Sequence, residues 1–298
     1  MSADWRALYP FEGKFITQRH GVRQHYLDEG HGPTVLMVHG NPSWSFYYRN
    51  LILSLRETHR CIVPDHVGMG LSDKPSDKNY RYTLQSRLDD LSRLMNEAAP
   101  HGPVDLIVHD WGGAIGLGWA LLNIPRVRRI VLLNTAAFLK PRDKVMPWQL
   151  KLGRDSMLGA LAIRGFNAFA DGATRFGTVR KLDPAVRAGL NAPYDSWRNR
   201  IATLRFVQDI PLDARDPAFS TLKSIDDSIH LLRDKPSIAL WGMRDFVFDH
   251  HFLDEFERRW PALKTTRFED AGHYVLEDKP EAICAAVRTF LNASAAPV

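Results

Sequence analysis

The chain has few cysteines and no long apolar run. Among its 298 residues Cys61 and Cys284 are far apart, and no CxxC motif occurs. This spacing argues against a disulfide framework or a structural zinc site and favours reduced thiols. No apolar stretch approaches the roughly 18 residues of a membrane span. The first residues show no basic stretch followed by an apolar one, so we expect a cytoplasmic protein without a membrane span.

Strong net charge is absent from most of the chain. Residues 137–230 contain 15 Lys and Arg against 10 Asp and Glu, whereas the remainder contains 24 of each. These basic residues are dispersed and accompany no nucleic-acid-binding motif, so nucleic acid is not an expected partner. We expect them to cover a solvated surface, with docking to an acidic protein or a membrane surface as the alternative.

What the chain does contain is an alternation of short apolar runs and helical patterns. The runs predict buried strands over residues 34–38, 61–63, 104–108, 129–133, 237–241 and 265–268. Helices are predicted over residues 111–122 and 281–291, and after Thr83, which can cap a helix N-terminus. The alternation predicts an α/β fold, with a mostly parallel sheet and helices on both faces.

The alternation stops in one long segment. Residues 137–230 show mainly helical patterns with scattered aromatic residues, so we expect a helical lid there, inserted into a core formed by residues 1–136 and 231–298. A lid over the edge of a sheet encloses an apolar pocket suited to a small apolar substrate. The aromatic residues predicted to line this pocket are Trp148, Phe166, Phe169 and Phe206.

Three titratable residues follow predicted strands in the order of a catalytic triad. In VDLIVHDWGGAIG (104–116), Asp110 follows a strand and two glycines open a helix. This is the strand–turn–helix pattern of a nucleophile elbow, with Asp in place of Ser. Asp245 and His273 follow later strands. The chain order of nucleophile, acid and histidine predicts the α/β-hydrolase fold.

The motif HGNPSW (39–44) directly follows another predicted strand. In this fold, that loop and the residue after the nucleophile supply backbone amides to an oxyanion hole. Asn41 and Trp111 occupy these positions, and their side chains add two neutral N–H donors. Such donors beside a carboxylate nucleophile suit a departing anion. We expect neither a metal nor an organic cofactor.

These motifs resemble those of the Asp-nucleophile α/β-hydrolases of the haloalkane dehalogenase group. The resemblance is strongest to the branch that also contains the β-lactone decarboxylases of olefin biosynthesis. It runs from about residue 9 to residue 291, and includes PDHVGMGLSDKP (64–75) and APYDSWRNRI (192–201). The resemblance implies that Asp110 is the nucleophile, His273 the base and Asp245 the acid, with Asn41 and Trp111 as leaving-group donors.

Two reactions remain open at this site. The first expectation is a hydrolase that cleaves a carbon–halogen bond through a covalent alkyl-aspartate and releases alcohol and halide. The alternative is a lyase that converts a cis-3,4-dialkyl β-lactone to an alkene and CO₂. The same residues would serve both. A hypothesis of another class is a non-catalytic subunit that scaffolds a biosynthetic assembly through its basic lid. The partners expected of the enzyme are a small apolar substrate and a homo-oligomer or biosynthetic assembly formed through the same lid.

Overall fold

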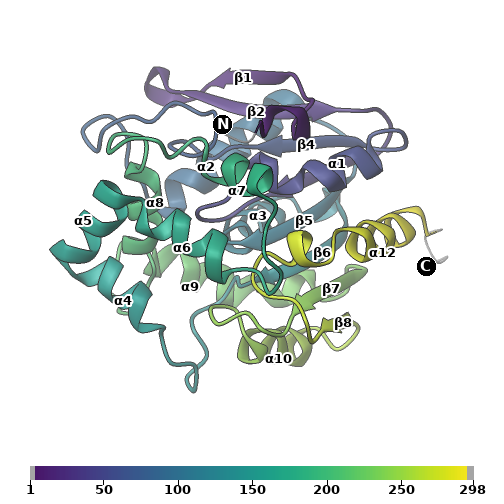
Figure 1. Cartoon of the computed structure of the whole chain (residues 1–298). Helices are drawn as coiled ribbons and strands as arrows, with labels where there is room; N and C mark the ends of the chain where they lie inside the picture. The colour runs from purple at the N-terminus through teal and green to yellow at the C-terminus, as the bar shows by residue number, and fades with distance from the viewer. Residues whose placement is uncertain (1–3, 294–298) are drawn as a thin grey trace.

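A central sheet of eight strands organises the molecule (Figure 1). The computed structural model describes residues 4–293. The strand order is β1-β2-β4-β3-β5-β6-β7-β8. The strands are β1 (Gly13–Thr17), β2 (Arg23–Glu29), β3 (Thr34–Val38), β4 (Arg60–Pro64), β5 (Val104–Asp110), β6 (Val127–Thr135), β7 (Ser237–Gly242) and β8 (Lys264–Phe268). β2 pairs antiparallel with both β1 and β4, and the other neighbouring strands are parallel.

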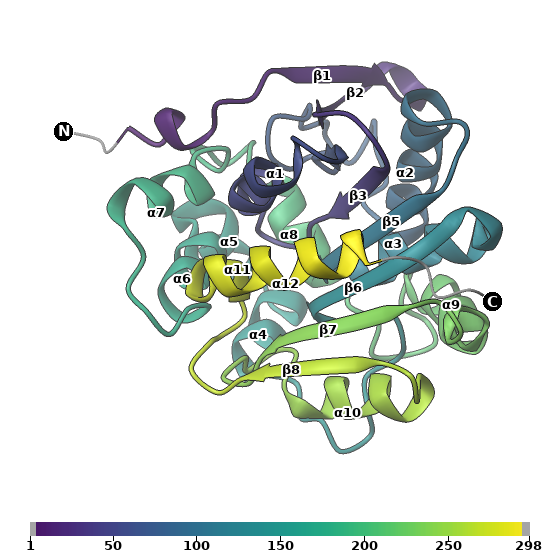
Figure 2. The same ribbon diagram turned by 90° about the vertical axis from the view of Figure 1, so that its right-hand side faces the viewer.

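Helices cover both faces of this sheet (Figure 2). One face packs against α1 (Arg49–Leu55), α11 (Val275–Asp278) and α12 (Pro280–Asn292). The other packs against α2 (Leu84–Ala98), α3 (Gly112–Leu122) and α10 (His250–Arg259). Successive strand residues point to opposite faces. In β5, accordingly, Leu106 and Val108 join one apolar cluster and Ile107 joins the other.

The predicted α/β-hydrolase fold is confirmed. The six predicted runs fall within β3 to β8, and the predicted helices correspond to α2, α3 and α12. At the start of α2, the Thr83 hydroxyl accepts a hydrogen bond from the backbone amide of Ser86 at 3.3 Å, as expected of an N-cap. The antiparallel strands β1 and β2 were not predicted.

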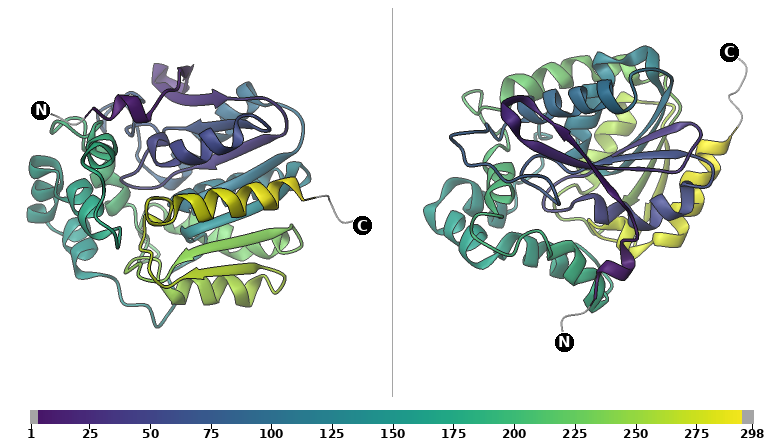
Figure 3. Two further views of the ribbon diagram at one scale, coloured as in Figure 1. Left: turned by 45° about the vertical axis from the view of Figure 1, so that its right-hand side comes forward. Right: turned by 90° about the horizontal axis from the view of Figure 1, so that it is seen from above.

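A helical insert follows β6 and ends before β7 (Figure 3). Its helices are α4 (Trp148–Asp155), α5 (Met157–Phe166), α6 (Ala168–Phe176), α7 (Pro184–Asn191), α8 (Ile201–Gln208) and α9 (Phe219–Ser228). α4 packs against α5 and α8, whereas α9 packs against α2 and α3 beside the sheet. The segment predicted as a lid therefore contains one helix that contacts the core helices. Among residues 4–293, no helix is long and apolar enough to cross a membrane.

Candidate active site

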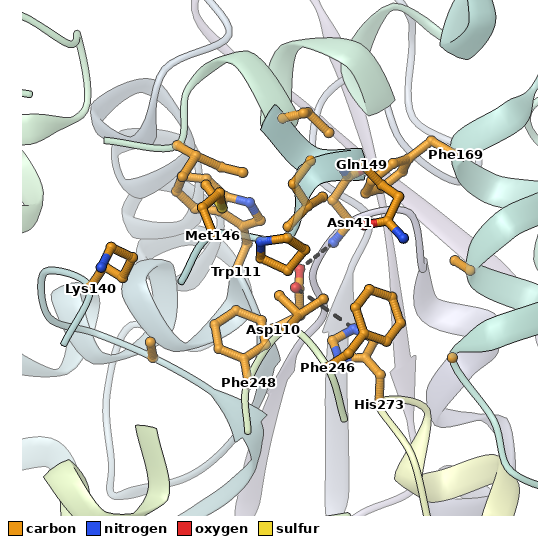
Figure 4. A pocket seen from close by; sticks show the side chains of 18 of the residues that line it. Asn41, Asp110, Trp111, Lys140, Met146, Gln149, Phe169, Phe246, Phe248 and His273 are labelled. Carbon is orange, nitrogen blue, oxygen red and sulfur yellow. Dashed lines mark hydrogen bonds and ion pairs between the residues drawn. The ribbon is translucent and has the colours of Figure 1, made fainter. Parts of the chain in front are cut away.

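Asp110 stands in a sharp turn between β5 and α3 (Figure 4). Its φ is 53°, in the left-handed region that residues other than glycine rarely adopt. The second residue after Asp110 must be glycine, because a Cβ on Gly112 would lie 2.0 Å from the carbonyl oxygen of Val38. The turn thus lifts the Asp110 carboxylate out of the end of the strand, as a nucleophile elbow does.

The loop after β3 holds one oxygen of this carboxylate. The backbone amide of Asn41 donates to Asp110 Oδ1 at 2.6 Å. The side-chain amide of Asn41 donates to the carbonyl oxygen of Thr203 in α8 at 3.1 Å. The indole of Trp111 and the side chain of Asn41 both border the cavity above Asp110. The two predicted donors therefore lie on either side of the candidate nucleophile.

His273 joins the two carboxylates. Its Nδ1 lies 2.8 Å from Asp245 Oδ2, and its Nε2 lies 3.7 Å from Asp110 Oδ2. Asn134 steadies this arrangement, because its side-chain amide donates to Asp245 Oδ2 at 3.1 Å. The ring of Phe248 stacks on that of His273, with centroids 5.9 Å apart. The three residues thus have the mutual geometry of a nucleophile, a base and an orienting acid.

The electrostatics of the site follow from its burial. Burial raises the pKa of Asp110 to about 6, although the charge of His273 and the amides of Trp111 and Asn41 lower it. Burial by itself lowers the pKa of His273. The charge and hydrogen bond of Asp245, together with the charge of Asp110, outweigh this effect and raise that pKa above its ordinary value. As the pH falls, Asp110 therefore loses its charge at a higher pH than an aspartate in water does, and His273 holds its proton to a higher pH than a histidine in water does.

An apolar cavity of about 790 Å³ opens above Asp110 and His273. Two of the predicted aromatic residues, Trp148 and Phe169, line it. Phe166 does not line it and is 75% exposed at the end of α5. Phe206 is buried behind Trp111 instead, with ring centroids 5.6 Å apart. Both positions differ from the sequence prediction because they depend on how the insert helices pack.

Sequence reasoning missed several cavity residues. They come from the segment before α4, from the first turn of α4 and from the loop after Asp245, and are Lys140, Met146, Gln149, Phe246 and Phe248. The short separation of the two phenylalanines from Asp245 was the available signal.

Within residues 4–293, one cluster could hold a metal ion: Asp249, His250 and His251 at the start of α10. The carboxylate of Asp249 is already bonded to Lys144 and caps α10.

Comparison with known proteins places this chain in one family. A family model described as the alpha/beta hydrolase fold matches residues 33–280. The chain belongs to this family. A haloalkane dehalogenase of Agrobacterium tumefaciens has a similar solved structure, with a TM-score of 0.83 at 22% identity, covering 94% of this chain and 96% of that one. At this identity the likeness concerns the fold.

Within the α/β-hydrolases, two kinds of curated relatives place the chain more closely. A protein of Xanthomonas campestris named cis-3-alkyl-4-alkyloxetan-2-one decarboxylase is 50% identical to this chain, and the match covers 95% of this chain and 97% of the relative. A protein of the same name from Shewanella oneidensis is 46% identical, and the match covers 96% of this chain and 90% of the relative. Haloalkane dehalogenase 2 of Mycobacterium bovis is 32% identical, covering 94% and 95%. The chain is therefore an enzyme of the branch that contains β-lactone decarboxylases and haloalkane dehalogenases.

Proposed function

We propose that this α/β-hydrolase is a β-lactone decarboxylase acting on oxetan-2-ones with alkyl chains at both ring carbons. The observation that carries the proposal is the difference in similarity, 50% and 46% to the decarboxylases against 32% to the dehalogenase, over nearly the whole chain. Hydrolytic dehalogenation, the first expectation from the sequence, becomes the second candidate, because the same two N–H donors beside Asp110 would also stabilise a departing halide.

The cavity supports a substrate of this size and polarity. Its volume of about 790 Å³ lies in the upper part of the range for small-molecule sites. On α6, the small residues Ala168, Gly172 and Ala173 line it and leave room beside Phe169. In this proposal α4 to α8 form the lid over the substrate. The apolar walls would receive the alkyl chains and direct the polar ring toward Asp110.

In the first step, Asp110 would attack the ring carbon that bears the ring oxygen. The bond between this carbon and the ring oxygen breaks, and its electron pair stays on the oxygen. The substrate is then joined to Asp110 as an ester and carries a free carboxylate on the neighbouring carbon. Asn41 and Trp111 would donate hydrogen bonds to this carboxylate as its charge develops.

In the second step, the bond to that carboxylate breaks and CO₂ leaves. The electron pair of this bond forms the alkene double bond, while the ester bond to Asp110 breaks and restores the aspartate. No water, proton or oxidant enters the balance. The positive charge that Asp245 favours on His273 would stabilise Asp110 as it leaves. Dehalogenation differs here, because hydrolysis of the ester needs neutral His273 to activate water.

This difference gives the test. Wild type, Asp110→Asn and His273→Ala would each be incubated with a cis-3,4-dialkyl oxetan-2-one and, separately, with 1-bromobutane. Alkene is measured by gas chromatography, and adducts on Asp110 by peptide mass spectrometry. We expect alkene from the wild type, none from Asp110→Asn, and slower but continuing alkene release from His273→Ala. Asp89→Asn, which alters an exposed carboxylate of α2, is the matched control.

Each contrary result has a distinct meaning. Turnover of the bromide without any reaction of the lactone would replace the proposal by dehalogenation, with a butyl adduct accumulating on Asp110 in His273→Ala. Alkene formation by Asp110→Asn at the wild-type rate would rule out Asp110 as the nucleophile.

A further inference from the structure

Helix α5 exposes an apolar face. Its exposed positions are Met157, Leu158, Leu161, Gly165 and Phe166, which are all apolar or glycine. Met157 is 91% exposed, and Leu158 and Phe166 are each 75% exposed. The inner side of the helix is satisfied, because Ile163 joins a buried cluster with residues of α8. Single exposed apolar residues are ordinary, but a whole helix face of them marks an interaction surface.

The neighbouring helix extends this face. α4 packs against α5 and exposes Trp148 and Leu152, and Figure 1 shows the two helices side by side at the edge of the molecule away from α12. We call this surface the lid patch. It consists of Trp148, Leu152, Met157, Leu158, Leu161 and Phe166.

The charges around the lid patch are mainly positive. Lys151, Arg164 and Arg198 make no ion pair with another residue of the described range 4–293. Of the nearby carboxylates, Asp155 is bonded to Arg154, and Asp195 accepts a hydrogen bond from the side-chain amide of Asn199. The guanidinium of Arg164 lies 4.5 Å from the ring centre of Trp197. This second indole is half exposed beside α5. The guanidinium of Arg164 also donates to the carbonyl oxygen of Trp197 but has no carboxylate partner. Apolar side chains and indoles beside cations without ion-pair partners are the composition of a surface that lies on an anionic bilayer.

The cavity opens beside the same surface. Trp148 belongs to the lid patch, is 70% exposed and also lines the cavity. Phe176, at the end of α6, is likewise exposed and lines the cavity. α6 packs against α5. A bilayer in contact with the lid patch would therefore lie next to the cavity mouth.

We propose that the lid patch docks on the surface of a bilayer that contains anionic lipids, with the apolar side chains in the headgroup region and the cations against the lipid phosphates. A bilayer fits better than a second copy or a partner protein. A protein seated there would cover the cavity mouth, whereas a bilayer can deliver an apolar substrate to it. The delivery of a dialkyl lactone rests on the proposed function; the docking does not.

The test is flotation of the full chain with vesicles. Wild type is expected to float with vesicles of phosphatidylethanolamine and phosphatidylglycerol, less with phosphatidylcholine alone, and less at high salt because screening weakens the contact of the cations. In the double variant Met157→Glu/Leu158→Glu the bound fraction should fall about tenfold or more. Leu122→Glu is the matched control, since Leu122 is 68% exposed at the end of α3, outside the lid patch, and α3 packs against α2 and α9.

Several outcomes would overturn the proposal. The first is a wild type that stays unbound with anionic vesicles, and the second is a double variant that floats as the wild type does. The third is a wild type that light scattering shows to be a dimer or another assembly, which the double variant loses without a change in flotation. Met157 and Leu158 do not line the cavity, so the variant should decarboxylate a short-chain lactone dispersed in water at the wild-type rate. Loss of flotation with that rate retained isolates docking from catalysis. Flotation by a wild type that forms no alkene would leave docking intact and refute the proposed function.

Discussion

Asp110 must carry its charge in order to attack carbon, yet it is buried. Because burial raises the pKa of Asp110 to about 6, we expect the rate of the first step to fall as the pH drops through about 6. An aspartate in water would keep its charge down to about pH 4. The measurement is a single-turnover pH profile of ester formation. The rate of this step should be level above the transition, and a rate that stays constant down to pH 4 would contradict this environment for Asp110.

Gly40 lies against the nucleophile. A Cβ at this position would lie 1.9 Å from Asp110 Oδ1, so Gly40→Ala should turn the carboxylate away from its amide donor on Asn41. We expect activity to fall about 10²-fold, which is typical of a misplacement of about 1 Å, and the thermal unfolding midpoint to fall as well, because the added methyl overpacks a buried site. Gly165→Ala is the control, because the nearest atom to its new Cβ would be at 3.4 Å. Full activity in Gly40→Ala would show that the carboxylate does not need this position.

The candidate site could be predicted from the sequence where it depends on strand ends. Asp110, Asp245 and His273 each follow a parallel strand, and parallel strands bring their carboxyl ends to one edge. Phe166 and Phe206 depend instead on the direction in which insert helices face, and helical spacing alone does not decide whether a buried face meets a cavity or a neighbouring ring. Their side chains accordingly lie on the surface and behind Trp111.

At the scale of elements, a buried ion pair joins α1 to α11, the helix that follows His273. Arg49 donates to both carboxylate oxygens of Glu277, at 2.6 and 2.8 Å. Glu277→Ala would leave a buried guanidinium without its counter-charge, so we expect a loss of about 3–5 kcal/mol in the free energy of unfolding. Urea unfolding followed by tryptophan fluorescence measures it.

Two further variants separate the charge effect from packing. Arg49→Met/Glu277→Leu removes both charges together and should recover much of the stability, because no charge is then left buried alone. The ion pair of Lys223 with Asp227 is exposed, so Asp227→Asn should cost less than about 1 kcal/mol. Equal losses in Glu277→Ala and the double variant would mean that shape, rather than charge, dominates at this contact.

The elements that the sequence predicted and those it missed differ in burial. β3 and β5 are buried on both faces, and each has at least three consecutive apolar residues, Val35–Val38 in β3 and Leu106–Val108 in β5. β1 has one buried residue among five and lies at the edge of the sheet, and β2 contains charged and polar residues between its apolar ones. Their patterns are too short and too polar to be told from a loop. What holds them in place is pairing along the sheet, which is a tertiary effect.

At the scale of the whole molecule, the end of the strand–helix alternation after β6 indicated the insert. The packing of the insert helices could not be derived from that pattern. The cavity combines residues before α4, residues of α6 and residues of the loop after Asp245. These segments are separated by long stretches of chain, and no local sequence pattern predicts that they come together in the fold. The size of the cavity, which bears on the choice between a halide and a dialkyl lactone, is therefore a property of the assembled fold.

One ammonium group ties the first part of the insert, before α4, to the core. Lys144 Nζ donates to the carbonyl oxygen of Phe246 and to Asp249 Oδ2, both at 2.8 Å, and its side chain is 7% exposed. Lys144→Met removes these contacts and leaves the Asp249 carboxylate without its cation. We expect thermolysin to cleave around the exposed Val145 several-fold faster than in the wild type, because local opening of this segment becomes easier.

Lys140→Met provides the matched comparison for this prediction. Lys140 lies in the same segment and also borders the cavity, but its ammonium bonds to the carbonyl oxygens of Pro141 and Lys144, within that segment. The loss of this charge should leave the cleavage rate near that of wild type, since no contact with the core is removed. Equal acceleration in both variants would mean that positive charge, rather than the bridge to Phe246 and Asp249, protects the segment. Faster cleavage in Lys144→Met alone would place the bridge among the contacts that hold the insert above the carboxyl ends of the strands.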